Sequence, residues 1–85
     1  MPTVRVVIAD DHPVVRSGIR DMLDSAEGID VVDEAECGTE ALQKVDEHQP
    51  DVLLLDVEMP EMSGVEVAQK LQEENSPVRL LALSS

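Results

Sequence analysis

Four segments of the chain have the apolar pattern of β-strands. Residues 4–9 and 51–56 are short runs rich in Val, Ile and Leu, a pattern typical of strands buried on both faces of a parallel sheet. Residues 78–83 form a similar run near the end of the chain. Residues 29–36 mix apolar side chains with Asp and Glu, which is typical of a strand at the edge of a sheet. The sequence therefore predicts four strands.

Three segments between these strands have the spacing of helices. Pro13 suits the first turn of the first helix, where its missing N–H costs nothing, Gly38 opens the second helix, and Pro50 stops it. The third helix begins at a capping box, which Ser63 and Glu66 form with the pattern S-x-x-E. The residues expected to face the sheet are Val15, Ile19, Met22 and Leu23, then Ala41, Leu42 and Val45, then Val65, Ala68 and Leu71. The order βαβαβαβ predicts an α/β fold with a parallel sheet and right-handed crossovers.

Composition and charge exclude several classes of function. The chain has 85 residues, of which 42% are hydrophobic, and this suffices for one folded domain. Six basic and 19 acidic side chains give a net charge of −13, which argues against direct binding to nucleic acid or to an anionic membrane. The single cysteine, Cys37, favours a reducing cytoplasm. The acidic excess fits a solvated surface that maintains solubility, or a salty cytoplasm.

Acidic residues stand where two of the predicted strands end. Asp10 and Asp11 follow the first strand, Asp56 ends the third, and Ser84 follows the fourth. The carboxyl ends of parallel strands meet at one edge of the sheet, where ligands bind. Neighbouring carboxylates repel one another unless a cation lies among them, and Mg²⁺ prefers such oxygen ligands. One Asp alone is usually a turn residue, but together these residues predict a magnesium site with a carboxylate nucleophile toward phosphorus.

Three stretches of sequence carry a resemblance to a known family. They are Val6–Pro13 with its D-D-H-P end, Leu53–Gly64 with the pattern D-x-x-M-P-x-M-x-G, and Leu83–Ser84. Together they closely resemble the receiver domain of bacterial two-component response regulators, most of all the NarL/LuxR-type subfamily, in which the receiver precedes a helix-turn-helix DNA-binding domain. The resemblance spans all 85 residues. It implies a flavodoxin-like (CheY-like) doubly wound parallel sheet with strand order 2-1-3-4.

The resemblance also implies a role for each residue at the acidic edge. Asp56 would accept the phosphoryl group. Asp11 would bind Mg²⁺ directly, and Asp10 would assist through a water molecule. The backbone carbonyl of Glu58 would complete the protein's share of the coordination. Ser84 would supply the switch hydroxyl that turns toward the phosphoryl group.

The family's partners follow from the same resemblance. The phosphoryl donor would be a phosphohistidine on a sensor histidine kinase, which docks on the first helix. Phosphorylation in the parent protein would control an attached DNA-binding domain and transcription in the cytoplasm. The chain itself would be a phosphoryl acceptor with at most weak autophosphatase activity, and would bind neither DNA nor a membrane.

The length of the chain departs from the family's pattern. A complete receiver has five strands and five helices, so we expect residues 1–85 to form a partial receiver domain. The last strand, the last two helices, the lysine after the fifth strand and the output domain would be absent. The strand over 78–83 then becomes an unprotected apolar edge. We therefore expect a homodimer or higher oligomer, with strands paired across chains.

Other functions fit the sequence less well. A phosphatase of the haloacid dehalogenase type needs Asp two residues after its nucleophile, but residue 58 is Glu. A nucleotide-binding fold needs a glycine-rich loop where Asp10–Pro13 stands. His12 beside the acidic pair is weak evidence for zinc, and in the family's pattern it only precedes the first helix. The remaining alternative is a truncated fragment that does not signal and self-associates through its apolar edge.

Overall fold

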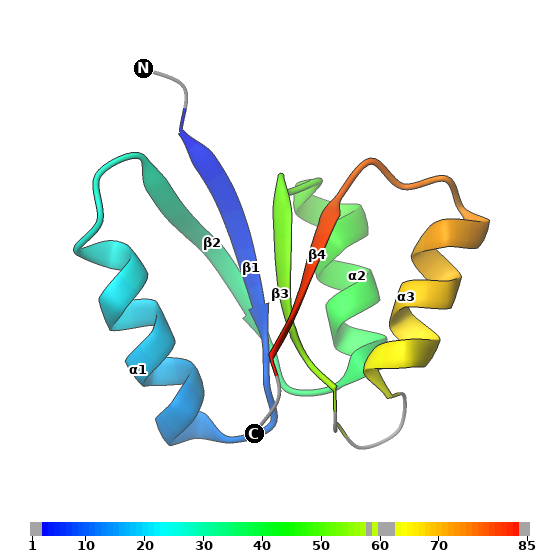
Figure 1. Cartoon of the computed structure of the whole chain (residues 1–85), viewed down its shortest axis with the longest axis horizontal. Coiled ribbons are helices and arrows are strands. Elements are labelled where there is room, and N and C mark those ends of the chain that lie inside the picture. The colour runs from blue at the N-terminus through cyan, green and yellow to red at the C-terminus, as the bar shows by residue number, and fades with distance from the viewer. Residues whose placement is uncertain (1–2, 58, 60–62, 84–85) are drawn as a thin grey trace.

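The chain folds into a four-stranded parallel sheet with helices on both faces (Figure 1). This computed structural model describes residues 3–57, 59 and 63–83. Its elements are β1 (Val4–Ala9), α1 (Pro13–Asp24), β2 (Ile29–Ala35), α2 (Gly38–His48), β3 (Val52–Asp56), α3 (Gly64–Glu73) and β4 (Arg79–Leu83). The strand order is β2-β1-β3-β4, and all neighbouring strands are parallel. The predicted α/β fold and its strand order are therefore confirmed.

The inner strands β1 and β3 are buried because helices cover the sheet on both faces. Val7, Ile8 and Ala9 of β1 and Leu53 of β3 have no exposed surface. The two strands pair in register, with Ala9 opposite Leu55. Their carboxyl ends consequently lie side by side, which brings the residues that follow β1 close to the end of β3.

The two faces of the sheet have separate apolar clusters. Helices α2 and α3 cover one face, where their side chains pack against Val7, Ala9 and Leu53. Helix α1 covers the other face (Figure 1), where Ile19 and Leu23 pack against the cluster around Ile8. Burial of both faces of β1 explains why its sequence is continuously apolar from Val6 to Ala9 rather than alternating.

The predicted inward face of α1 is only half right. Ile19 and Leu23 pack on the sheet, but Met22 is 70% exposed and Val15 is 48% exposed. Among the described residues, α1 has no neighbouring helix on its face of the sheet. A lone helix on a sheet buries a single row of side chains, so the rows on either side of Ile19 and Leu23 stay accessible to solvent.

The predicted inward face of α3 is also partly wrong. Val65 is 59% exposed, whereas Val67 is fully buried and Leu71 nearly so. The helix begins at Gly64, where an added Cβ would lie 2.9 Å from the Cα of Val57. This close approach turns the row at positions 64, 67 and 71 toward the sheet, and Val65 faces away. The predicted N-cap is present, since the Glu66 amide donates to Ser63 Oγ at 3.3 Å.

Within the described ranges, no helix is long and apolar enough to cross a membrane.

Candidate functional site

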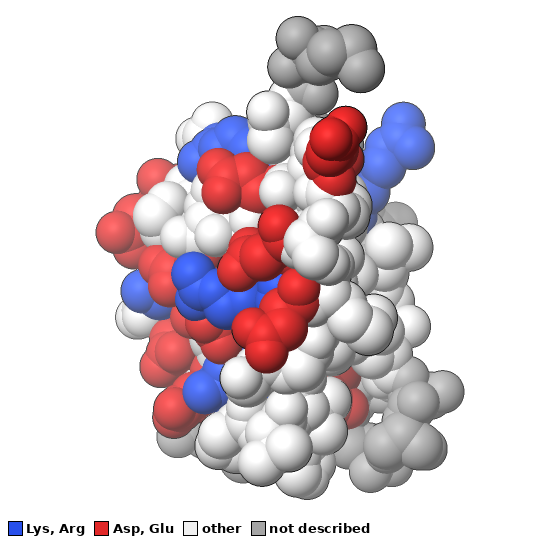
Figure 2. All heavy atoms as spheres, turned by 90° about the vertical axis from the view of Figure 1, so that its left-hand side faces the viewer, with Lys and Arg blue, Asp and Glu red and all other residues white. Residues whose placement is uncertain are grey.

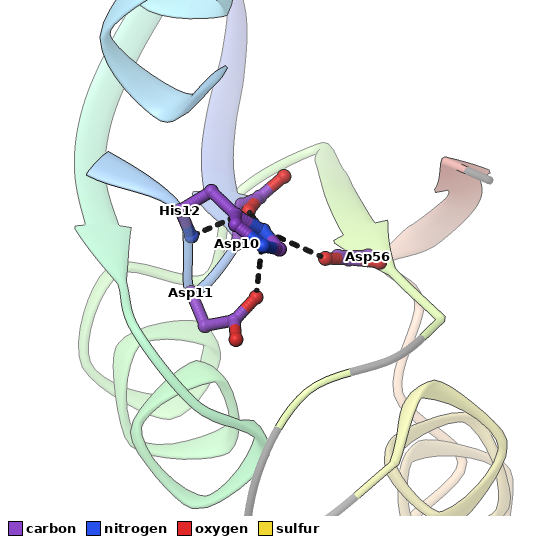
Figure 3. Close-up of side chains that lie close together, drawn as sticks. All are labelled: Asp10, Asp11, His12 and Asp56. Carbon is purple, nitrogen blue, oxygen red and sulfur yellow. Dashed lines mark hydrogen bonds and ion pairs between the residues drawn. The ribbon is translucent and has the colours of Figure 1, made fainter. Parts of the chain in front are cut away.

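Three carboxylates meet at the carboxyl ends of β1 and β3 (Figure 3). Asp10 and Asp11 come directly after β1, and Asp56 is the last residue of β3. Asp10 is 3% exposed and Asp56 is 5% exposed, so both lie beneath the surface. Each of the three offers an oxygen within 4.8 Å of the others and of the His12 ring. The structure thus brings together three of the residues singled out from the sequence.

Asp10 connects the acidic cluster to the start of α1. Its Oδ1 accepts a hydrogen bond from the His12 amide at 2.7 Å, and its own amide donates to the carbonyl of Ala35 on β2 at 3.0 Å. The first contact closes a turn of the kind that short acidic side chains favour between a strand and a helix. Asp10 is therefore held by bonds to the start of α1 and to β2, and its Oδ1 already accepts a hydrogen bond.

His12 lies over the acidic cluster, although in the family's pattern it only precedes the first helix. Its Nδ1 is 3.2 Å from Asp10 Oδ1, 3.0 Å from Asp11 Oδ1 and 3.9 Å from Asp56 Oδ2 (Figure 3). The hydrogen bond with Asp10, and then the charge of Asp11, raise the pKa of His12 above its ordinary value. The side chain is 63% exposed, so it stands at the mouth of the cluster.

The donor set of this cluster fits Mg²⁺. Oδ1 of Asp11 is buried and accepts no hydrogen bond from the described residues, although the His12 ring lies within ion-pair distance. A buried carboxylate oxygen without a hydrogen bond is costly unless a positive charge is near it. Hard oxygen donors on one open side are what Mg²⁺ takes from proteins, together with water. Asp10, Asp11 and Asp56 are thus suited to hold the ion.

Backbone hydrogen bonds hold Val57 and Gly64, two described residues that follow Asp56. The Val57 amide donates to the carbonyl of Leu83 at 3.3 Å, and the Gly64 amide donates to the carbonyl of Val57 at 3.1 Å. An added Cβ at Gly64 would lie 3.2 Å from the carbonyl oxygen of Asp56, so only glycine fits without displacement. Glu58 and Ser84, both singled out from the sequence, lie outside the described residues.

A family model described as "Response regulator receiver domain" matches residues 6–85. The chain belongs to this family. It is 41% identical over 81 residues to response regulator GacA of Pseudomonas viridiflava, covering 95% of this chain and 38% of GacA. It is 49% identical over 82 residues to a protein-glutamate methylesterase/protein-glutamine glutaminase of Haloarcula marismortui, covering 96% of this chain and 22% of that protein.

A solved receiver structure shows the same arrangement of elements. The signal receiver domain of response regulator NarL from Mycobacterium tuberculosis superposes with a TM-score of 0.96 at 42% identity. The alignment covers 99% of this chain and 68% of that one. This receiver chain spans about two fifths of the length of GacA, so the activities of the longer relatives are statements about those proteins. The resemblance seen in the sequence is confirmed at the level of family and fold.

Proposed function

We propose that this receiver domain accepts a phosphoryl group on Asp56 in a reaction that depends on Mg²⁺. The observation that carries the proposal is the meeting of three carboxylates at two adjacent strand ends, with a buried oxygen of Asp11 that accepts no hydrogen bond from the described residues. The nearest described cation to that oxygen is the exposed His12 ring, 3.0 Å away, which leaves the open side of the cluster to an ion. The family membership of the chain supports the same reading.

Asp56 has the position that a nucleophile needs. It ends β3 beside the end of β1, and the Val57 amide that follows it is bonded to the carbonyl of Leu83. One carboxylate oxygen of Asp56 would form the new O–P bond. The P–N bond of the donor phosphohistidine would break, its electron pair would stay on the imidazole nitrogen, and the product would be an acyl phosphate on Asp56.

Asp11 and Asp10 would hold the ion, Asp11 directly and Asp10 through water. When bound, Mg²⁺ supplies positive charge that offsets the repulsion between the carboxylates and the incoming phosphoryl oxygens. The backbone carbonyl of Glu58 would complete the coordination, and the Ser84 hydroxyl would turn toward the phosphoryl group. Both residues lie outside the described part of the chain, so these two roles rest on the family pattern.

The partner in this proposal is a sensor histidine kinase in the cytoplasm. The exposed row of α1, with Val14, Val15 and Met22, is the surface on which the kinase would dock. The chain acts as an acceptor rather than as an enzyme. In a longer parent, the acyl phosphate would control an attached helix-turn-helix domain and transcription, and residues 1–85 would form part of the receiver.

Intact-mass measurement tests the proposal directly. The chain is incubated with Mg²⁺ and acetyl phosphate, and we expect the gain of one phosphoryl group. Asp56→Asn should abolish the gain. Asp51→Asn is the matched control, because Asp51 lies just before the amino end of β3, far from the cluster, where its carboxylate accepts from the Arg5 amide at 2.9 Å. No gain in a chain that is folded by circular dichroism would identify a receiver fold without receiver chemistry.

We also infer that two copies of this chain pair through β4. Leu81 on this strand is 55% exposed, and the described structure pairs β4 only with β3. A second copy offers an identical edge, and antiparallel pairing about a two-fold axis would satisfy the backbone groups of both. In a longer protein the following chain would occupy this edge instead. Light scattering that shows a monomer at high concentration would contradict the pairing.

A further inference from the structure

The Arg16 side chain reaches from α1 back to the acidic cluster. Arg16 lies in the first turn of α1, and its amide donates to the His12 carbonyl at 2.9 Å. Side chains on a helix lean toward its amino end, and the Arg16 guanidinium meets the carbonyl oxygen of Asp10, with Nη1 at 2.7 Å. The side chain is only 13% exposed. It is thus a nearly buried cation bound to the backbone of the proposed magnesium site.

A carboxylate on β2 holds the guanidinium from the other side. Arg16 Nε donates to Glu34 Oε1 at 2.8 Å, and Nη2 lies 3.6 Å from Glu36 Oε1. Arg20, one turn further along α1, pairs with the second oxygen of Glu34. Glu34 therefore bridges two arginines of one helix, and of these two it is Arg16 that also bonds to Asp10. With several polar partners, the guanidinium has little freedom to move.

The carbonyl that Arg16 binds lies where the backbone leaves β1 and enters the acidic cluster. The pairing of β1 with β2 ends at Ala9 opposite Ala35, so the Asp10 carbonyl lies past the last paired residue. This carbonyl belongs to the peptide group that joins Asp10 to Asp11. When the direction of this carbonyl is fixed, the peptide plane is fixed too, and with it the direction in which the Asp11 side chain points. Mg²⁺ requires near-ideal ligand geometry, so a small rotation of this peptide would misplace the Asp11 oxygen.

We propose that Arg16 is a positioning residue for magnesium, which aims the Asp11 carboxylate by holding the Asp10–Asp11 peptide. This inference rests on the proposed function, because it assigns Mg²⁺ to the cluster. Arg16 does not touch the ion or the phosphoryl group. Partners of this kind, one shell beyond the ligands, typically change metal affinity by about 10-fold or more when they are removed.

Titration with Mg²⁺ alone, followed by calorimetry, tests the assignment. We expect Arg16→Met to weaken Mg²⁺ binding by about 10-fold, and Arg16→Lys to give an intermediate loss, since it keeps the charge but not the planar fork. Arg20→Met is the matched control: it removes the other arginine from Glu34 and leaves the Asp10 contact, so its affinity should stay within about 2-fold of the wild type. The Asp11 amide signal in ¹⁵N NMR spectra should shift in the Arg16 variants and not in Arg20→Met.

Each other result overturns the proposal in a distinct way. If Arg16 acted only through its charge, removing a cation would tighten Mg²⁺ binding. If it acted only on stability, Arg16→Met and Arg16→Lys would lower the melting temperature and leave the affinity of the folded protein unchanged. If Arg16→Met does not fold, Arg16→Lys decides between these outcomes. Failure of the wild-type chain to bind Mg²⁺ would refute the proposed function itself, and the role of Arg16 with it.

Discussion

The two edge strands of the sheet, β2 and β4, are protected very differently. Charged side chains from α1 and α2 cover the β2 edge: Arg16 and Arg20 pair with Glu34, and Lys44 and His48 pair with Asp33. Figure 2, with α1 toward the viewer, shows Lys and Arg side chains lying among Asp and Glu side chains on one part of this face. The β4 edge has Arg79 followed by four apolar residues.

This difference shows which strand edge the described part of the fold completes. The charged pairs at β2 disfavour the addition of a further strand there, since a neighbour would have to take them out of water. The same charges join both flanking helices to the sheet. At β4, an apolar hollow lined by residues such as Val65, Leu80 and Ala82 remains open on one face, and Leu81 is exposed on the other. Among the described residues, ion pairs therefore line the β2 edge, whereas apolar side chains are exposed at the β4 edge.

Of the changes that test this comparison, removal of the bridging carboxylate Glu34 should have the largest effect on stability. Glu34→Ala leaves Arg16 and Arg20 without their shared partner, and Arg16 is nearly buried. We expect the free energy of unfolding in urea to fall by about 2 kcal/mol. Glu36→Ala is the control, because the Glu36 side chain is 70% exposed and 3.6 Å from Arg16; its loss should stay below about 0.5 kcal/mol. Equal losses of stability in the two variants would refute the view that Glu34, as the shared partner of both arginines, stabilises the β2 edge.

A charge on the β4 edge should weaken self-association. Leu81→Lys places a cation on each of two facing strands, and we expect the dissociation constant in sedimentation equilibrium to rise by about 10-fold, or about 1.4 kcal/mol. Val14→Lys is the control, since Val14 is 85% exposed on α1 and away from the strand edge. A similar weakening by both substitutions would mean that nonspecific hydrophobic contacts, rather than strand pairing, hold the copies together.

Salt should act on the two edges in opposite directions. Each copy carries a net charge of −13, so two copies repel at low ionic strength. Raising the salt concentration from about 0.05 M to about 0.5 M screens this repulsion and should strengthen association through β4 a few-fold, while it weakens exposed ion pairs at β2. Sedimentation at both salt concentrations measures the change. Association that weakens with salt would indicate charge pairing between copies instead.

The smallest expected effect is the loss of stability at low pH that comes from protonation of Asp33. Burial alone would raise its pKa, but hydrogen bonds from the Glu34 amide, His48 and Lys44 together lower the pKa of Asp33 to about 2. A carboxyl whose pKa falls on folding stabilises the fold above its ordinary pKa of 3.8 and loses this contribution as the pH falls toward about 2. The side chain is 30% exposed, so the contribution should be under about 1 kcal/mol.

Comparison with Asp33→Asn isolates that contribution. The difference in unfolding free energy between the two proteins should be constant above pH 5 and should shrink between about pH 4 and pH 2. A carboxyl ¹³C titration should place the Asp33 midpoint well below those of the exposed acids. A midpoint near 4 would show that the contacts with Lys44 and His48 do not persist in solution.

Much of the fold follows from local sequence patterns. Apolar runs of four residues, VVIA and VLLL, made β1 and β3 recognisable, because an inner parallel strand is buried on both faces. Asp10, Asp11 and Asp56 were found because residues at the carboxyl ends of adjacent parallel strands must meet. Ser63 was recognised as a cap because its hydroxyl bonds an amide only three residues away. Each of these inferences depends on neighbours in sequence or on topology alone.

Other features depended on contacts between distant elements. Met22 and Val65 are exposed because packing, not periodicity, decides which rows of α1 and α3 meet the sheet. The sequence placed His12 beside the acidic pair, but not its approach to Asp56 on β3, and it gave no sign of Arg16, whose partner Glu34 lies on β2. The chain's own pattern thus determined the order of elements and the acidic strand ends. Only the tertiary structure decided which long side chains reach those ends, because their reach is set by how the helices lie on the sheet.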